Sequence, residues 1–576
     1  MTLNFEEDLM ETDEKLKTGA EIMVDCLKAE GVKFVFGVIG SSILDFQDVL
    51  YRTPEIRYIA TQHEQAAAFM ADGYARITGD TGVCTATCGP GATNMMTGIA
   101  GAFNESSPVV AVIGDIHTNH YGKGPANFHE INQENLFKPI TKLSKRIEQV
   151  HRIGEFMRMA FRVAQSGRKG PVYLGIPRNV QKEKTAQEVW PRERYRSEAT
   201  VRGDGKTIDQ ACQLLLKAKS PVMLVGGGVL WSRAQKEVLD LADLMGIPVA
   251  VSHKGLITED HPWSLGVIGM VGYPTAMDQV SKADLILALG CTFNQVTTAS
   301  YTNRIIPKDA KIIQVDIDPA EFGKNFAVEL GIVGDLKWVL LEMIEKLRPE
   351  AKGRGPAKEV RFKEVRSGKE QWEKRLISEG AESDAAPIRR LRLLRDLNKV
   401  AGKEAIFSAE SGATHGWFYY GCKVYSQILE PGDLSAMGSA WLMAMAAKLA
   451  YPSRPVISVT GDGAFMMTLN ELATAVKYKI PVVVIVPHNN VYGNVRRKQY
   501  EHFEARFAGS ELCVPDLARV AQSFGAHGER VEKPGEIIPA LERALAAGKP
   551  AVVDVLIDNS RENLEPPVKL RVKDRY

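Results

Sequence analysis

The sequence lacks the features with which proteins enter membranes or bind nucleic acids. No stretch approaches the roughly 18 consecutive apolar residues of a membrane-spanning helix. The 72 basic residues are balanced by 70 acidic ones, which leaves a net charge of +2 and no basic excess for a polyanion. The acidic start, MTLNFEEDLMETDEKLKTG, has no apolar core of a signal peptide. We therefore expect a cytoplasmic protein that binds neither membranes nor nucleic acids.

Cysteine is also sparse, with seven residues scattered along the chain. Cys84 and Cys88 stand close together, but they have no second cysteine pair and no nearby histidines, as a zinc site would require. Disulfides are rare in reducing compartments. We expect the cysteines to be free thiols of the protein core.

Apolar, strand-like runs, by contrast, recur through all 576 residues. Each is rich in Val, Ile and Ala and precedes a helical pattern, which is typical of parallel sheets with helices on both faces. The runs are KFVFGVIG, GVCTATCG, PVVAVIGD and PVYLGIP in the first third, PVMLVGGG, IPVAVS, ADLILALG and KIIQVDID in the middle, and EAIFSAESG, PVISVTGDG, PVVVIVPHN and PAVVDVLID in the last. The sequence therefore predicts an α/β protein with three doubly wound parallel-sheet domains.

Two charged stretches without apolar periodicity separate these domains. They are residues 181–205 and 348–386, and part of the second is compatible with a charged helix. The predicted domains are 15–185, 200–350 and 385–560, followed by a basic tail at 561–576. The tail is either solvated or folds over a binding cleft.

The segment VISVTGDGAFMM places an aspartate between two glycines at the end of a buried strand. In open parallel sheets, ligands bind beyond the carboxyl ends of the strands. Gly461 and Gly463 let backbone amides approach a phosphate, and AFMMTLNELATAVKY is expected to form a helix whose N-terminus favours negative charge. The next strand, PVVVIV, precedes Asn489, which neighbouring strand ends should bring close to Asp462. Their oxygens suit Mg²⁺, the usual counter-ion of a diphosphate; an Asx turn without metal is the alternative.

A second candidate lies in the first domain, in IATQHEQAAAFMADGYARITG. Glu64 begins a predicted helix of small residues, where a glutamate is usually only a favourable partner of the helix dipole.

Three separated stretches together resemble the acetolactate synthase-like superfamily of thiamine diphosphate (ThDP) enzymes. They are HEQAAAFMADGYAR, residues 87–115 and GDGAFMMTLNELATAVKYKIPVVVIVPHNN, in which Asn489 follows Asp462 by 27 residues. The resemblance extends from about Gly19 to Asp558. It implies a pyrimidine-binding, a central and a diphosphate-binding domain, and a homodimer or homotetramer whose active sites lie between two chains.

The resemblance also implies the site residues. Glu64 activates the cofactor, because ThDP chemistry needs an acid beside the pyrimidine ring, where it favours the tautomer that removes the thiazolium proton. Met437 supports the bent shape of the cofactor, and Asp462, Asn489 and the carbonyl of Val491 hold Mg²⁺. The expected cofactor contacts are Glu64, Gly412, Thr414, Met437, Gly461, Asp462, Gly463, Ala464 and Asn489. The catalytic candidates are Glu64, His129, His488 and Tyr492. The substrate-binding candidates are Ser41, Ser42, Phe128, His129, Arg496 and Arg497.

Some positions depart from the family pattern. His129 replaces the glutamine of a Phe-Gln-Glu segment, and Glu410-Ser411-Gly412 replaces an Asp-x-Gly motif. Further histidines, His63, His117, His120 and His415, are each expected to be structural. In the central domain, many relatives hold FAD or ADP. Here a glycine triplet at 226–228 is a weak sign of a nucleotide, and Thr292 stands where nucleotide-binding relatives often carry arginine, so a structural role is favoured and FAD or ADP stays open.

The reaction is expected to form or cleave a bond next to a carbonyl through a carbanion on the cofactor, with a small, anionic carbonyl substrate. The stretches HNNVYGNVRRKQYEHFEARFAGSEL and NFHEINQENLFKPITK most resemble sulfoacetaldehyde acetyltransferases, which convert sulfoacetaldehyde and phosphate to acetyl phosphate and sulfite. The alternatives are an acetolactate synthase-like 2-oxoacid carboligase, a 2-hydroxyacyl-CoA lyase or acyl-CoA decarboxylase, and a non-catalytic ThDP-binding scaffold. The three intact cofactor residues argue against a scaffold.

Overall fold

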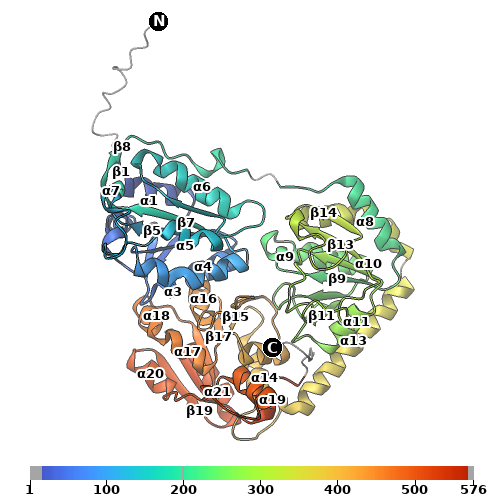
Figure 1. Cartoon of the computed structure of the whole chain (residues 1–576). Coiled ribbons are helices and arrows are strands. Elements are labelled where there is room, and N and C mark those ends of the chain that lie inside the picture. The colour runs from blue at the N-terminus through green and yellow to red at the C-terminus, as the bar shows by residue number, and fades with distance from the viewer. Residues whose placement is uncertain (1–15, 198–199, 354, 568–576) are drawn as a thin grey trace. The chain divides into compact units, whose positions relative to one another are not determined.

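The structure is a computed structural model that describes residues 16–197, 200–353 and 355–567 (Figure 1). These residues form two compact units. The first unit contains the described residues of 1–198 together with 431–450 and 468–480. The second contains those of 199–430 together with 451–467 and 481–576.

Three six-stranded sheets organise the chain, and every pairing within them is parallel. Their orders are β3-β2-β4-β5-β7-β6, β11-β10-β9-β12-β13-β14 and β16-β15-β17-β18-β20-β19. The helices between successive strands cover the sheets, because parallel strands need crossover connections, which are usually helical. This confirms the predicted α/β class with three doubly wound parallel-sheet domains.

The N-terminal sheet forms the first unit with its covering helices. Its strands are β2 (Phe34–Gly37), β3 (Arg57–Ala60), β4 (Gly82–Ala86), β5 (Val109–Asp115), β6 (Leu143–Arg146) and β7 (Val172–Pro177). Its helices are α1 (Gly19–Ala29), α2 (Leu44–Tyr51), α3 (Glu64–Thr78), α4 (Pro90–Asn104), α5 (Gln133–Phe137), α6 (Ile153–Gln165) and α7 (Arg178–Lys182). The short strands β1 (Lys17–Thr18) and β8 (Lys184–Thr185) pair antiparallel beside it.

Two helices from the last third of the sequence belong to this first unit. They are α16 (Ala440–Ala450) and α18 (Leu472–Lys477). Helix α16 packs closely on α3, because a Cβ on Gly73 would lie only 2.6 Å from the Cα of Met443. Small residues on α3 therefore allow this contact.

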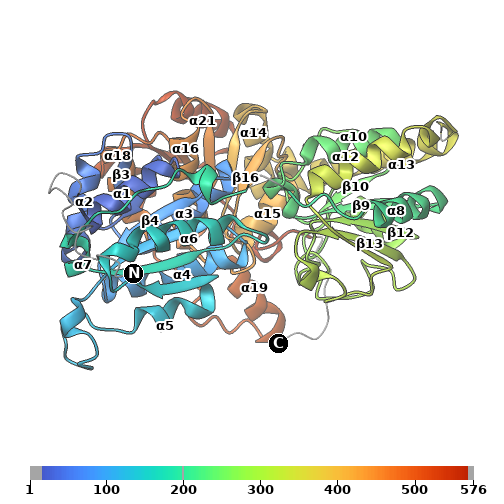
Figure 2. The ribbon, with the colours of Figure 1, turned by 90° about the horizontal axis from the view of Figure 1, so that it is seen from above.

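The central sheet lies in the second unit. Its strands are β9 (Pro221–Val225), β10 (Val249–Val251), β11 (Ser264–Val267), β12 (Leu285–Leu289), β13 (Lys311–Asp316) and β14 (Leu330–Val333). Its helices are α8 (Gly205–Lys217), α9 (Gly228–Trp231), α10 (Gln235–Met245), α11 (Pro274–Ser281) and α12 (Leu336–Leu347), of which α10 and α12 lie side by side (Figure 2).

The glycine triplet that followed β9 in the sequence has a packing role. A Cβ on Gly226 would lie 2.3 Å from the carbonyl oxygen of Gly290, and one on Gly228 would lie 2.8 Å from the Cα of Gly290. Two of the three glycines thus let the ends of β9 and β12 approach each other.

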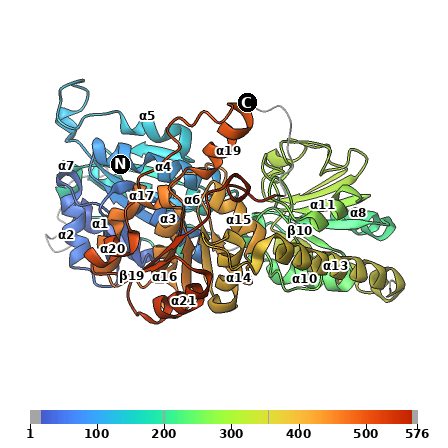
Figure 3. The ribbon, with the colours of Figure 1, turned by 90° about the horizontal axis from the view of Figure 1, so that it is seen from below.

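The C-terminal sheet completes the second unit. Its strands are β15 (Ile406–Ala409), β16 (Gln427–Leu429), β17 (Val456–Val459), β18 (Val483–His488), β19 (His527–Val531) and β20 (Ala551–Leu556). Its helices are α14 (Arg390–Ala401), α15 (Ala413–Gly421), α17 (Asp462–Thr468), α19 (Gly493–His502), α20 (Leu517–Ser523) and α21 (Ile537–Ala546), and α14 packs beside α15 (Figure 3).

One expectation about the helices needs correction. The segment 464–478 is not one helix: α17 starts already at Asp462 and ends at Thr468, and a 3₁₀ turn separates it from α18. The charged helix that the sequence allowed within residues 348–386 is present, because α13 spans Gly355–Leu376 and a π-helical turn continues to Ala381.

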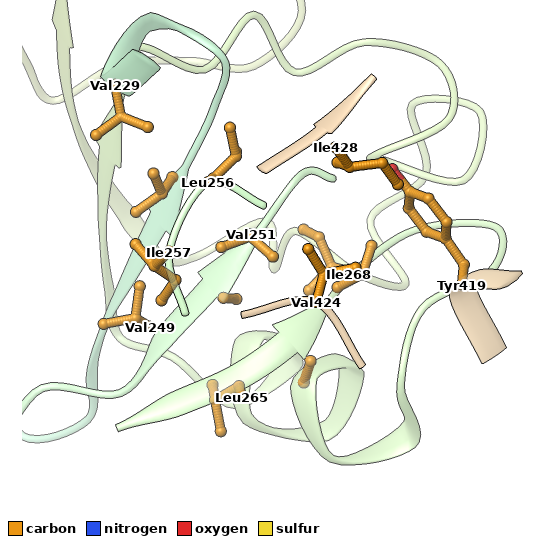
Figure 4. Close-up of a cluster of buried hydrophobic side chains, with 14 of the residues drawn as sticks. Val229, Val249, Val251, Leu256, Ile257, Leu265, Ile268, Tyr419, Val424 and Ile428 are labelled. Carbon is orange, nitrogen blue, oxygen red and sulfur yellow. The ribbon is translucent and has the colours of Figure 1, made fainter. Parts of the chain in front are cut away.

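The central and C-terminal sheets share one hydrophobic core. Tyr419 of α15, Ile428 of β16 and Val424 between them pack among residues such as Val251, Leu256 and Ile268 of the central domain (Figure 4). This shared core explains why the two domains form a single unit.

Candidate functional site

Asp462 lies where β17 ends and α17 begins, and its carboxylate is held by backbone donors. Its side chain is buried, with Oδ1 accepting from the N–H of Gly463 at 2.8 Å and Oδ2 from those of Asn489 at 2.9 Å and Asn490 at 2.7 Å. Burial raises the pKa of Asp462 above its ordinary value, although the three N–H groups oppose this. Because β17 and β18 are neighbours, the structure brings Asp462 and Asn489 together, as the sequence predicted.

The residues after β18 offer two further oxygens. The side-chain amide of Asn489 has two possible orientations. In the first, its Oδ1 lies 3.2 Å from the carbonyl oxygen of Val491, and neither oxygen carries a hydrogen that could bond the two. Adjacent oxygens of an octahedral Mg²⁺ site are about 3.0 Å apart, given metal–oxygen distances near 2.1 Å. The opposite amide orientation would instead place the oxygen 2.8 Å from Nη2 of Arg390. The buried carboxylate and this pair of oxygens fit a Mg²⁺ ion.

This site would not be found by looking for clustered acidic, histidine or cysteine side chains. Among the described residues, no three such side chains gather around a common point. The predicted ligands are a single carboxylate, an amide and a backbone carbonyl, which the neighbouring ends of β17 and β18 bring together.

Glycines and small residues shape a cradle around the turn. A Cβ on Gly463 would lie 2.5 Å from Cε1 of Tyr492, and one on Gly461 would lie 2.9 Å from Oγ1 of Thr414. Gly412, which precedes α15, has a φ of +76°, a conformation that favours glycine. Ala464 is buried in the first turn of α17. These positions carry little or no side chain, so the backbone of the turn lies close to Tyr492 and Thr414.

Glu64 begins α3 in the first unit, as predicted. Its Oε2 accepts from Nδ2 of Asn94 at 3.0 Å. Gly91 lies close to Oε1 of Glu64 and, because it has no side chain, does not cover this oxygen. The side chain is half-buried in the single chain. Met437, also in the first unit, is half-buried in the loop before α16.

Four predicted substrate-binding residues lie in the same unit, and one of them, Ser42, is already hydrogen-bonded to other residues of the protein. Ser42 is buried, with its Oγ 2.9 Å from Oγ1 of Thr87 and accepting from the N–H of Cys88 at 2.9 Å, whereas Ser41 is exposed. Phe128 is 76% exposed and stacks on the ring of His129, with centroids 3.8 Å apart.

His129 itself adopts a φ of +62° in the loop that leads to α5. Its Nδ1 is 4.0 Å from Sγ of Cys88. The two side chains therefore meet at the carboxyl end of β4, close to the turn that begins α4.

The predicted contacts after β18 are mostly occupied by other protein groups. His488 is buried, and its Nδ1 is 2.8 Å from Oδ1 of Asp554 on the neighbouring strand. Burial lowers the pKa of His488, but the bond to Asp554 and the charge of its carboxylate outweigh this and raise it. This contact favours a structural role for His488 over the catalytic role that the sequence suggested.

Arg496 and Arg497 lie in α19 rather than in a loop. Nη1 of Arg496 is 3.0 Å from Oε1 of Glu511, and Arg497 pairs with both Glu501 and Glu565. Their charges are thus balanced within the protein, which weakens the expectation that they bind anionic substrates. Tyr492 precedes α19 and covers Gly463 with its ring.

Sequence reasoning missed two residues that hold the site. Arg390 is buried at the start of α14, and its Nη1 donates to the carbonyl oxygens of Asn563 at 2.7 Å and Leu564 at 3.3 Å. Glu471 accepts from the N–H groups of Gln62 and His63, just before Glu64. Each acts across a large sequence separation, so no local pattern marks it.

Comparison with known proteins shows three matching family profiles in the same order as the three sheets. The thiamine pyrophosphate enzyme N-terminal TPP binding domain matches residues 17–136, the central domain 208–344, and the C-terminal TPP binding domain 410–555. These matches cover the regions of Glu64 and of the Asp462 turn.

Similar proteins cover almost the whole chain. A probable acetolactate synthase large subunit of Methanocaldococcus jannaschii is 38% identical over 94% of this chain and 92% of the relative. One from Methanococcus aeolicus is 37% identical over 95% and 94%. The acetolactate synthase isozyme 3 large subunit of Escherichia coli is 33% identical over 95% and 96%. The chain therefore belongs to the acetolactate synthase-like superfamily of thiamine-diphosphate-dependent enzymes.

Proposed function

We propose that this protein is a 2-oxoacid carboligase that joins two molecules of pyruvate to acetolactate with release of carbon dioxide. Acetolactate consists of an acetyl group bonded to the carbonyl carbon of pyruvate, so two pyruvate anions and one proton balance one acetolactate anion and one carbon dioxide. The observation that carries this proposal is the 38% identity, over 94% of the chain, to a protein named as a probable acetolactate synthase large subunit. It favours the carboligase over the sulfoacetaldehyde acetyltransferase expected first from the sequence.

The cofactor-binding residues suit this chemistry. When bound, ThDP supplies a nucleophilic carbon and accepts the electron pair left by carbon dioxide. Asp462, Asn489 and the carbonyl of Val491 would hold Mg²⁺, and the glycines on either side of Asp462 would let backbone amides approach the diphosphate. Glu64, steadied by Asn94, would donate a hydrogen bond to the pyrimidine ring and so move a proton at the ring nitrogen.

We further propose that two copies of the chain build each active site. Glu64 is half-buried in one chain, although an acid of this kind works best where water is excluded. Phe103, at the end of α4, and Leu434 are large apolar side chains that are 41% and 39% exposed in the first unit. A second copy that covers this surface would also desolvate the site.

The reaction is tested with purified protein, ThDP and Mg²⁺. We expect pyruvate to yield acetolactate and one equivalent of carbon dioxide. The same protein is offered sulfoacetaldehyde with phosphate, and 2-hydroxyacyl-CoA esters. Phosphate-dependent release of sulfite, or CoA-ester cleavage, without acetolactate would replace the carboligase proposal.

The roles of Glu64 and Asp462 are tested by two variants. Glu64→Gln should still bind ThDP but lose about 10²- to 10⁴-fold in turnover, as expected for a lost general acid–base group. Asp462→Ala should lose Mg²⁺ and ThDP together, measured by metal analysis and cofactor titration. Full activity of Glu64→Gln, or unchanged cofactor affinity of Asp462→Ala, would refute the respective role.

Mixing these two variants tests the shared site. If each site combines Glu64 of one chain with Asp462 of another, a mixed dimer has one intact site. Random assortment upon co-expression then restores about one quarter of wild-type activity, because half of the dimers are mixed and each has one of two sites. Co-expression without recovery of activity, in samples shown by mass to contain mixed dimers, would place both residues in one chain's site.

A further inference from the structure

The side-chain amide of Asn489 lies between the carbonyl oxygen of Val491 and the guanidinium of Arg390. In its metal-facing orientation, the amide oxygen points to Val491 and Nδ2 points to Nη2 of Arg390. In its arginine-facing orientation, the oxygen accepts from Nη2 at 2.8 Å and Nδ2 donates to the carbonyl oxygen of Val491 at 3.2 Å. The amide can adopt only one of these orientations at a time.

The arginine-facing orientation engages two of the three expected metal ligands. The amide oxygen of Asn489 is hydrogen-bonded to Arg390, and the carbonyl oxygen of Val491 is hydrogen-bonded to the Asn489 amide. Protein hydrogen bonds therefore satisfy both oxygens, as buried polar groups require. A Mg²⁺ ion needs the same two oxygens, so it must displace both hydrogen bonds.

The metal-facing orientation places like groups next to each other. Oδ1 of Asn489 and the carbonyl oxygen of Val491 are both acceptors 3.2 Å apart, and a divalent cation bound to both makes this pair favourable. Oδ1 also accepts from the N–H of Val491 in a long contact of 3.4 Å. Nδ2 of Asn489 and Nη2 of Arg390, however, are both donors 2.8 Å apart, and a cation on the other side does not relieve them.

The guanidinium of Arg390 is held in place from the side away from Asn489. Its Nη1 donates to the carbonyl oxygens of Asn563 and Leu564, and the indole N–H of Trp417 donates to the same Asn563 oxygen at 3.1 Å. The residue is buried, with 5% of its surface exposed. Because the guanidinium is planar and rigid, fixing Nη1 also fixes Nη2 beside the amide.

We propose that Arg390 competes with the metal ion for the amide oxygen of Asn489 and thereby sets the affinity of the site for divalent cations. The proposal rests on the metal site of the proposed function and not on the carboligase reaction. A protein of which only a fraction is in the binding-competent conformation loses affinity by that fraction. Here the competent fraction has the amide turned away from Arg390. A guanidinium has no acceptor atom, so Arg390 acts through Asn489 and is not itself a ligand.

The competition is tested by titrating the full chain with Mn²⁺ in the absence of substrate, with the free ion followed by electron paramagnetic resonance. Arg390→Lys keeps the positive charge, but an ammonium bound to the carbonyls of Asn563 and Leu564 is a single centre that does not also span to Asn489. We expect the Mn²⁺ dissociation constant to fall about ten- to hundredfold, the range for a lost hydrogen bond from a charged group. Arg390→Met should lower it by a similar factor.

The matched control is the preceding residue. Arg389 pairs with Asp558 at 3.2 Å, and its side chain is 39% exposed. Arg389→Lys and Arg389→Met should leave the Mn²⁺ dissociation constant within about twofold of wild type. Tighter binding in Arg390→Met but not in Arg390→Lys would assign the effect to charge repulsion and overturn the proposal. Unchanged or weaker binding in both folded Arg390 variants would overturn it as well.

The choice of metal separates competition from distortion of the turn. The ratio of the wild-type to the variant dissociation constant should be the same for Co²⁺ as for Mn²⁺, because the cost lies in the amide and the guanidinium and not in the metal bonds. A distorted turn would affect the two ions unequally, since divalent metals differ in their preferred ligands and geometry. Unequal ratios would therefore contradict the proposal.

A change of the amide itself provides a second test. In Asn489→Asp, the carboxylate has two acceptor oxygens, so one can bind Arg390 while the other faces the metal. Addition of Arg390→Lys to this variant should then change the Mn²⁺ dissociation constant less than about twofold. A ten- to hundredfold decrease in the double variant would overturn the competition for one oxygen.

The wild-type protein gives a test without any substitution. In crystals with Mg²⁺ and ThDP, Nη2 of Arg390 should lie more than about 3.5 Å from the Asn489 amide, beyond the range of hydrogen bonds. In metal-free crystals it should stay within hydrogen-bond distance. A contact of the same length in both crystals would overturn the proposal.

Asp462→Ala separates this proposal from the proposed function. Loss of Mn²⁺ binding in Asp462→Ala, together with unchanged binding in the Arg390 variants, would reject the competition and keep the metal site. Unchanged Mn²⁺ binding in Asp462→Ala would reject the metal site and the competition together. Acetolactate formation is measured separately, so failure of the carboligase reaction leaves the metal titrations interpretable.

Discussion

At the scale of single residues, glycine is needed on the two sides of Asp462 for different physical reasons. Gly463 is required by its neighbours, because the ring of Tyr492 and the side chain of Leu512 occupy the space that a Cβ would take. Gly461 faces the hydroxyl of Thr414. The aspartate between them is oriented by backbone N–H groups from the next strand's turn, so its position depends on both loops at once.

We predict that Gly463→Ala weakens ThDP binding about tenfold or more, because overpacking of this kind costs about 1–3 kcal/mol. The added methyl group would lie 2.5 Å from Cε1 of Tyr492, and the rigid ring of Tyr492 could avoid it only by moving as a whole. Cofactor titration by fluorescence or calorimetry measures the effect. Gly535→Ala is the control, since no atom lies within 4 Å of its Cβ position, and equal affinities of the two variants would contradict the steric argument.

At the scale of elements, the segment around α18 holds the approach to Glu64. The carboxylate of Glu471 is buried and accepts from the N–H groups of Gln62 and His63 and from Oγ1 of Thr474. The hydroxyl of Tyr478 accepts from the N–H of Ala60 at 2.9 Å. The end of β3 and the start of α3 are thereby fixed from outside their own sequence.

We predict that Glu471→Gln lowers kcat about tenfold while ThDP affinity changes little, because one acceptor oxygen is lost and Glu64 is displaced, and small misplacements of this kind are costly. Exchange of the thiazolium C2 proton, followed by NMR on the loaded enzyme, should slow in parallel. The control is Glu536→Gln, since Glu536 also accepts from two backbone N–H groups, those of Glu532 and Lys533, at the surface. Normal C2-proton exchange in Glu471→Gln would show that Glu471 does not position Glu64.

The contact between His415 of α15 and Glu430 at the end of β16 predicts that the stability of the fold depends on pH. Burial alone would raise the pKa of Glu430, but the hydrogen bond and charge of His415 lower it to about 2, from 4.5. A carboxyl with a lowered folded-state pKa stabilises the fold above its unfolded-state value and loses this contribution as the pH falls toward 2.

We therefore expect wild type to exceed Glu430→Gln in unfolding free energy by about 3 kcal/mol above pH 4.5, from 1.36 kcal/mol per pKa unit. The difference should shrink steadily between pH 4.5 and 2. Denaturant unfolding of both proteins across this range provides the measurement. A difference that stays constant with pH would show that the ionised form of Glu430 is not selectively stabilised.

At the scale of the whole molecule, a buried lysine joins the central and C-terminal domains of the second unit. The side chain of Lys254 is fully buried, and its Nζ donates to Oε1 of Glu259 at 2.5 Å, the hydroxyl of Tyr273 at 2.7 Å and the carbonyl oxygen of Cys422 at 2.7 Å. Each of the three N–H groups of Nζ therefore has an acceptor, and the hydrogen bond to Cys422 reaches the C-terminal domain. The apolar core that the domains share surrounds this contact.

We predict that Lys254→Met destabilises the second unit by about 3–5 kcal/mol, because Glu259 would keep a charge without its partner in a largely buried place. Thermal unfolding followed by calorimetry should show an earlier transition. Lys346→Met is the control, because Lys346 pairs with Asp209 at the surface and its removal should leave the transition where it is. An unchanged transition in Lys254→Met would contradict a stabilising role.

At this same scale, no helix among the described residues is both long enough and apolar enough to span a membrane bilayer. The charged helix α13, the longest of the protein's helices named above, has 22 residues and lies along the central domain.

How much of the fold the sequence predicts depends on strand position. The twelve apolar runs correspond to the four inner strands of each sheet, whereas β3, β6, β11, β14, β16 and β19 were missed, and these are the edge strands. Inner strands of a parallel sheet are covered on both faces and need continuous apolar residues. Edge strands such as β6, LSKR, and β19, HGERV, are partly exposed and carry charges, so composition does not reveal them.

The sequence by itself determined the α/β class, the three sheets, the family and the pair formed by Asp462 and Asn489, because these depend on local composition and on motifs with fixed spacing. The tertiary structure decided which residues support and surround them: Glu471 at the backbone just before Glu64, Arg390 beside Asn489, and Lys254 between two domains. It also showed that Arg496, Arg497 and His488 are already engaged with carboxylates. Such contacts join residues that lie far apart in the sequence, and only the packing of sheets and helices brings their side chains together.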